Sequence, residues 1–255
     1  MLRAITFSIL LCIVDALACA AEPMSLVNRA GEQRMLSQRM VKFYCQVGMD
    51  VMPSQSRVAL RESIARFEEN LEVLKPAAER WPETAQAFER LTRAWEPVRA
   101  AASQPASRDS ALALARQADD VLVAAERLTR AMEDASGQPI SHAINLAGRQ
   151  RMLSQRLAKA YMLRSWGIDS AAVREEMDSA ANEFNGALTI LMARPENTDQ
   201  IRDELQDLAL QWEWLQTAVS SEGAASYRLI VAEASESILA AANRITRLYD
   251  QVARR

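Results

Sequence analysis

The chain has 255 residues, of which 49% are hydrophobic and 25% charged, and its formal net charge is −3. This composition can fill one large core or two small ones, and its mildly acidic balance gives no support to nucleic-acid binding. A single histidine cannot supply a zinc site of suitable spacing, and no CxxCH sequence for haem attachment occurs. We therefore expect no metal and no cofactor.

The first twenty residues predict a secretory signal peptide. A short basic start precedes an apolar stretch over residues 4–14, and the small residues at positions 18–20 match a cleavage site. We therefore expect a periplasmic protein whose mature chain begins near Ala21 and keeps only Cys45, so that no intramolecular disulfide can form. A lipoprotein acylated at Cys19 stays open as an alternative. No later segment has 18 consecutive apolar residues, so no transmembrane segment is expected in the mature chain.

The sequence contains an internal repeat with a period of 117 residues. Residues 28–44, NRAGEQRMLSQRMVKFY, recur as residues 145–161, NLAGRQRMLSQRLAKAY, with twelve of the seventeen positions identical. Without any gap, the same offset aligns large apolar residues that we expect in the core: Phe67 with Phe184 and Trp95 with Trp212. A period shared along the chain indicates two copies of one structural module.

Each copy is predicted to form four helices. In the first copy they cover residues 25–48, 55–79, 83–102 and 108–135, and the second copy breaks at WGIDS, RPENTD and SSEGAAS. Proline and glycine are nearly confined to these breaks, and good helix formers fill the rest. Because short connections make neighbouring helices antiparallel, we expect an all-α fold of two tandem up-down-up-down four-helix bundles. The expected division is a signal peptide in 1–20, a first module in 21–136 and a second in 137–255.

The linker between the modules leaves two arrangements open. An even number of helices brings both ends of each module to the same end of the bundle, and Gly137 and Pro139 can then turn the chain so that the second module stands beside the first in parallel. The alternative is end-to-end stacking through a nearly continuous helix.

The residues shared between the two motifs do not form a single stripe. At about 100° per residue, identical polar and apolar residues fall on several faces of the helix, whereas a helix kept only for its core contact preserves one face. We interpret this as a constraint beyond burial, although local gene conversion would produce the same pattern.

The second copy of the motif resembles a known family. Residues 141–161, SHAINLAGRQRMLSQRLAKAY, are similar to the first-helix signature of the PilJ-type and NarX-type periplasmic sensor domains, and the first copy matches at Asn28, Ala30, Gly31 and residues 33–39. Such domains occur in nitrate and nitrite sensor kinases, in nitrate chemoreceptors and in the type IV pilus chemotaxis transducer. The resemblance covers essentially the whole mature chain, and it implies a four-helix sensor in each copy.

The resemblance also implies an anion site. In the nitrate-sensing members, one arginine of this string from each of two subunits holds a single nitrate, helped by the backbone near the glycine. By position these residues are Arg34 and Arg151, with Gly31 and Gly148. A planar guanidinium matches the planar nitrate ion, and an anion between two facing arginines relieves their repulsion. Residues that could support the site are Asn28, Asn145, Gln38, Gln155, Arg39 and Arg156.

The leading hypothesis is a periplasmic binding protein for nitrate or nitrite that signals or delivers to a membrane sensor, chemoreceptor or transporter. For Arg34 and Arg151 the competing interpretation is a salt bridge to a carboxylate on a neighbouring helix. The alternative function is a ligand-free helical module that docks on a pilus, chemoreceptor or envelope complex. No GxSxG, HExxH or phosphate-loop sequence is present, so we do not expect an enzyme.

Overall fold

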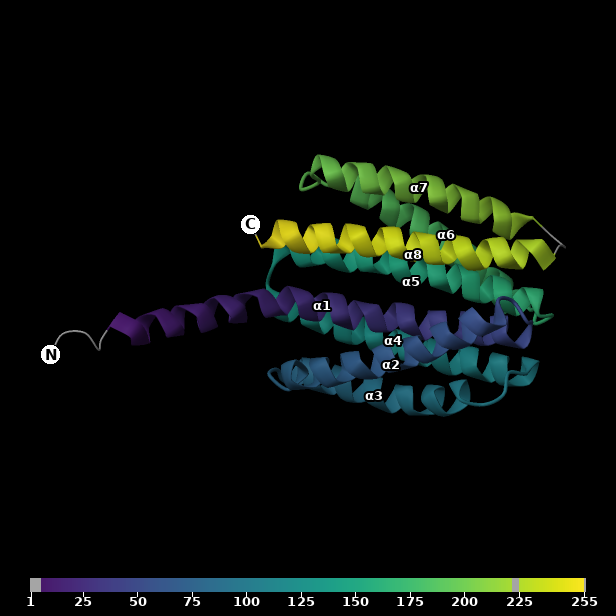
Figure 1. Ribbon diagram of the computed structural model, residues 1–255, viewed down its shortest axis with the longest axis horizontal. Helices are drawn as coiled ribbons and strands as arrows, with labels where there is room; N and C mark the ends of the chain where they lie inside the picture. The colour runs from purple at the N-terminus through teal and green to yellow at the C-terminus, as the bar shows by residue number, and fades with distance from the viewer. Residues whose placement is uncertain (1–5, 222–224, 255) are drawn as a thin grey trace.

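The described part of the chain is built entirely from helices (Figure 1). This computed structural model describes residues 6–221 and 225–254, with side chains described over 26–221 and 227–254. In chain order the helices are α1 (Thr6–Gly48), α2 (Pro53–Ala78), α3 (Pro82–Ala102), α4 (Arg108–Ser136), α5 (Pro139–Ser165), α6 (Ala171–Met192), α7 (Asp199–Ser220) and α8 (Ala225–Ala253). The prediction of an all-α fold with two tandem helical bundles is confirmed.

The helices start at the breaks that the sequence indicates. Three of them begin with a proline, whose missing N–H is no loss in the first turn: Pro53, Pro82 and Pro139. Three others have a hydroxyl that caps the backbone N–H three residues on: Ser107, Ser170 and Thr198. Only the first helix differs clearly from expectation, because it begins at Thr6 instead of near residue 25. Residues 6–22 contain no glycine or proline that would interrupt a helix.

The expected signal peptide lies outside the residues whose side chains are described. Residues 1–5 lie outside the described residues, and for 6–20 only the helical backbone of α1 is described. The secretory signal and its cleavage site therefore stay predictions.

The two bundles lie side by side, with α1 and α5 at the centre (Figure 1). In the first bundle α1 packs against α2 and α4, and α3 completes it against α4; α5–α8 repeat this arrangement. Gly137 ends α4 with φ of 61°, a left-handed conformation that glycine adopts without strain, and the chain then turns into α5. End-to-end stacking is therefore wrong, since α5 runs beside α1 and parallel to it.

Each bundle is filled by a matching aromatic pair. Phe67 of α2 stacks on Trp95 of α3 with ring centroids 4.1 Å apart, and Phe184 of α6 stacks on Trp212 of α7 at 3.7 Å. All four rings are buried, as expected for core residues. The pairs hold the two outer helices of each bundle together, which leaves α1 and α5 to meet across the middle.

The central position of α1 and α5 explains why the motif is shared on several faces. Each of these helices is covered by its own bundle on one side and by the other bundle on the opposite side. Polar residues all around α1 are consequently buried, among them Gln33, Arg34, Ser37, Gln38 and Lys42. Burial on all sides accounts for the pattern that the sequence alone attributed to a constraint beyond burial.

Candidate anion site at the seam between the two bundles

Two glycines leave room for a pair of arginine side chains between the central helices. We call the line of contact between α1 and α5 the seam. A Cβ atom added to Gly31 would lie 3.0 Å from Nη2 of Arg34 and 3.7 Å from Nη2 of Arg151, and one added to Gly148 would lie 3.0 Å from Arg151 and 3.5 Å from Arg34. Both guanidinium groups therefore converge on the same glycine-lined point. The structure brings together the four residues that the sequence named.

Each arginine reaches across the seam to an asparagine of the other copy. Nη2 of Arg34 donates to Oδ1 of Asn145 at 2.8 Å and to its backbone oxygen at 3.4 Å. Nη2 of Arg151 donates to the same two atoms of Asn28 at the same two distances. The reciprocal bonds show that the copies are related by a pseudo-two-fold axis running along the seam.

The two asparagines are themselves held by acidic residues at matching positions. The side-chain amide of Asn28 donates to Asp250 of α8 at 3.1 Å, and that of Asn145 donates to Glu133 of α4. Since the amide nitrogen is bound in this way, the amide oxygen of each asparagine is turned towards the arginine. Asn28 and Asn145 therefore orient the arginine pair.

The symmetry ends at the second nitrogen of each guanidinium. Nη1 of Arg34 forms an ion pair with Oε2 of Glu126 at 2.5 Å, whereas Nη1 of Arg151 donates to the neutral amide oxygen of Asn243 at 3.1 Å. Nε of Arg34 donates to the backbone oxygen of Gly31 at 3.4 Å. Nε of Arg151 is buried and has no hydrogen-bond partner among the residues that the structure describes. The salt bridge considered as the competing interpretation is thus present for Arg34.

Burial dominates the electrostatics of both arginines. The side chain of Arg34 is 0% exposed, and burial lowers its pKa although Glu126 acts in the opposite direction. Burial lowers the pKa of Arg151 to about 10; Glu32 opposes this change, and the nearby charge of Arg34 adds to it. A buried cation bonded to neutral groups alone is unfavourable, and an anion placed beside it would reduce that cost.

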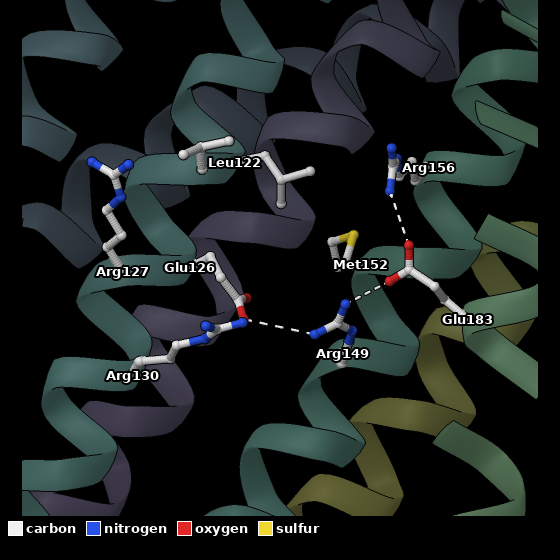
Figure 2. A pocket seen from close by; sticks show the side chains of 9 residues that line it. Leu122, Glu126, Arg127, Arg130, Arg149, Met152, Arg156 and Glu183 are labelled. Carbon is white, nitrogen blue, oxygen red and sulfur yellow. Dashed lines mark hydrogen bonds and ion pairs between the residues drawn. The ribbon is translucent and has the colours of Figure 1, made fainter. Parts of the chain in front are cut away.

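A groove on the surface is lined by residues of α4, α5 and α6 (Figure 2). Its volume is about 320 Å³ and its lining includes Glu126, the carboxylate bound to Arg34. On the groove side this carboxylate also contacts Arg130 at 3.0 Å and Arg149 at 3.7 Å, and Arg149 in turn pairs with Glu183 at 2.5 Å. Burial alone would raise the pKa of Glu126, but Arg34 and the other arginines outweigh it and lower that pKa. Glu126 therefore stays ionised between Arg34 and the groove.

The remaining residues predicted to support the site serve other contacts. Gln38 and Gln155 donate to the backbone oxygens of residues 118 and 235, at 3.5 and 2.9 Å, which ties each central helix to the last helix of its bundle. Arg39 binds Glu236 at 2.6 Å, and Arg156 binds Glu176 at 3.0 Å. None of these partners is a group bonded to Arg34 or Arg151.

Two buried lysines, which the sequence analysis did not single out, link the bundles further along the seam. Lys42 of α1 pairs with Glu236 of α8 at 2.5 Å, and Lys159 of α5 pairs with Asp119 of α4 at 2.8 Å. Both lysines are fully buried and occupy identical positions of the repeated motif. Their identity in the two copies was the available signal, because a buried lysine needs a carboxylate partner.

The fold and the seam together define the class of protein: two pseudo-symmetric helical bundles that belong to one chain. The family model described as "Type IV pili methyl-accepting chemotaxis transducer N-term" matches residues 24–121 and again residues 135–248. The chain therefore belongs to this family, PilJ, and carries two copies of its domain, which confirms the resemblance seen in the sequence. The family is one of sensory, signal-transducing domains and not of enzymes.

No curated protein and no solved structure matches the chain. Over the described residues, no helix has both the length and the apolar character needed to cross a lipid bilayer.

Proposed function

We propose that this protein is a periplasmic sensory protein that binds one small anion, nitrate or nitrite, at the seam between its two PilJ domains. The observation that carries the proposal is the convergence of Arg34 and Arg151 on the close approach at Gly31 and Gly148. Membership of a sensory family supports the sensory part of the proposal.

The chemistry of the seam suits a small planar anion. A guanidinium group presents its N–H donors in one plane, which matches the three coplanar oxygens of nitrate. Arg34 and Arg151 belong to different bundles and meet at the seam, so an anion bound at this pair would couple binding to the packing of α1 against α5. A ligand that binds one packing arrangement more tightly shifts the protein towards it, and this is the change that a partner could detect.

The expected partner is a membrane sensor, a chemoreceptor or a transporter. The family description, which names a chemotaxis transducer of type IV pili, supports a partner in chemoreceptor or pilus signalling. Location in the periplasm follows from the signal peptide predicted in residues 1–20.

Isothermal titration calorimetry of the purified chain with nitrate, nitrite, chloride and sulfate tests the proposal. We expect saturable binding of nitrate or nitrite with one anion per chain, and loss of that binding in Arg151→Gln. Arg127→Gln is a matched control, because Arg127 is an exposed arginine of α4 outside the seam. Absence of binding to every anion would refute the ligand, and unchanged affinity in Arg151→Gln would refute the site.

A second candidate function, docking on a pilus, chemoreceptor or envelope complex without a ligand, is favoured by the outer face of α7. Trp214 and Leu210 lie one helical turn apart on α7 and are 74% and 62% exposed. The first copy has Pro97 and Arg93 at these positions, so the apolar pair belongs to the second copy alone. A complex retained by Arg151→Gln and lost in Trp214→Ala would favour docking; one unaffected by Trp214→Ala would exclude this face.

A further inference from the structure

One difference between the two copies changes the charge of the seam. Glu126 and Asn243 occupy matching positions, each one residue before the paired strings Arg-Leu-Thr-Arg and Arg-Ile-Thr-Arg. In the structure each bonds Nη1 of the arginine of its own bundle, Glu126 to Arg34 and Asn243 to Arg151. Two otherwise equivalent half-sites therefore differ by one negative charge.

The Arg34 half is already neutralised. Its guanidinium has an acceptor at each of its three nitrogens, namely Glu126, Asn145 and the backbone of Gly31. With a carboxylate at 2.5 Å, Arg34 already has a counter-ion, which Arg130 and Arg149 share from the groove side.

The Arg151 half is not neutralised. The acidic groups near it are used elsewhere: Glu32 of α1 pairs with Arg66 at 3.1 Å, and Asp250 of α8 accepts from Asn28. Within the described ranges no carboxylate lies within ion-pair distance of Arg151, which is only 4% exposed. Its Nε is the one guanidinium nitrogen of the pair without an acceptor there. One positive charge and one free donor are therefore left on this side of the pseudo-two-fold axis.

We propose that Glu126 is a built-in counter-ion that closes the Arg34 half, so that the seam accepts a single monovalent anion, bound off-centre at the free Nε of Arg151. This inference rests on the proposed function and specifies the charge of its ligand. A monoanion balances the single free charge. A dianion would bring excess negative charge into a buried site that already contains the Glu126 carboxylate.

Removing the counter-ion tests the proposal in one direction. In Glu126→Gln we expect nitrate affinity to rise about tenfold, because a negative charge a few ångströms from the bound anion is lost. Sulfate affinity should rise by a larger factor, since two unbalanced guanidinium groups then face the ligand. Glu183→Gln is the matched control: it removes a carboxylate from the same groove but leaves the Arg34–Glu126 pair intact, so nitrate affinity should change less than about threefold.

Adding a counter-ion tests it in the other direction. Asn243→Glu supplies Arg151 with a carboxylate at the position from which Glu126 serves Arg34. We expect nitrate affinity to fall by about tenfold or more, because the new carboxylate competes with the anion for the same charge. In a buffer whose only anion is a large sulfonate, we also expect the melting temperature to rise by about 2–4 °C as the buried charge is compensated.

These measurements separate the two proposals. If the wild-type chain binds nitrate and Glu126→Gln behaves like Glu183→Gln, the counter-ion role is wrong and the proposed function stands. If no form binds an anion but Asn243→Glu still gains stability without anions, the proposed function is wrong and the charge asymmetry stands. If Asn243→Glu neither gains stability nor weakens nitrate binding, Arg151 is not the unbalanced half and the inference is overturned.

Discussion

Lys42 is a buried cation whose partner belongs to the other bundle, and removing that partner gives a quantitative test of the seam. Its Nζ contacts Glu236 at 2.5 Å and Ser235 at 3.0 Å, and burial lowers its pKa to about 8 despite the opposing effect of Glu236. In Glu236→Gln a fully buried ammonium group keeps only neutral partners. Breaking a buried pair costs about 3–5 kcal/mol, and because the Glu236 side chain is 33% exposed we expect about 2–3 kcal/mol.

Asp119→Asn, at the position matching Glu236 in the first copy, provides the internal control. Lys159 would keep a second carboxylate, Glu176 at 2.6 Å, so the loss of Asp119 should cost less than about 1 kcal/mol. The assay is urea and thermal unfolding followed by circular dichroism, in which Glu236→Gln should lower the melting temperature by about 5–10 °C. Equal destabilisation by the two substitutions would show that the second carboxylate of Lys159 makes no difference, and the reasoning would fail.

The remaining predictions concern close packing and titration. Gly48→Ala should cost about 1–3 kcal/mol in urea unfolding, because its Cβ would lie 2.1 Å from the ring of Trp166. Gly186→Ala, in a helix with no atom within 4 Å of the new Cβ, should instead stabilise the protein by about 0.5–1 kcal/mol. If Gly186→Ala destabilised the protein more than Gly48→Ala, the close contact between Gly48, at the end of α1, and Trp166 would be refuted. Burial alone would raise the pKa of Glu236, but Lys42 and Arg39 lower it from 4.5 to about 2. The free energy of unfolding should therefore fall as the pH falls from 4.5 to about 2. A melting temperature that does not change over this pH range would contradict the prediction. Burial raises the pKa of Cys45 to about 12, so a thiol reagent should modify it only on unfolding, and rapid labelling of the native protein would be inconsistent with its position.

Most of the fold could be predicted from the sequence because its signals are local or repeated. Proline and serine or threonine caps mark where helices begin, and the 117-residue period shows that the architecture is doubled. The meeting of Arg34 with Arg151 was implied by the resemblance to the PilJ-type and NarX-type sensor domains, and the structure places both guanidinium groups near Gly31 and Gly148.

The charge balance of the seam could not be predicted, since it depends on which residues from distant helices reach the arginines. Glu126 and Asn243 stand 92 residues after the arginines that they contact. The sequence shows many carboxylates at helical spacing, and only the packing of α4 against α1 selects Glu126. The buried lysines were missed similarly, because Glu236 and Asp119 lie on helices of the other bundle.

The short link from α4 to α5 has a consequence for what the contact between the bundles can contain. Two separate chains must gain enough free energy on association to remain together at their cellular concentration, and the desolvation of buried arginines and lysines works against that gain. A tether of a few residues makes the encounter intramolecular and raises the effective concentration to about the millimolar range. Because the chain itself keeps the two bundles together, their contact surface can contain buried polar and charged groups and does not need a large favourable free energy of association.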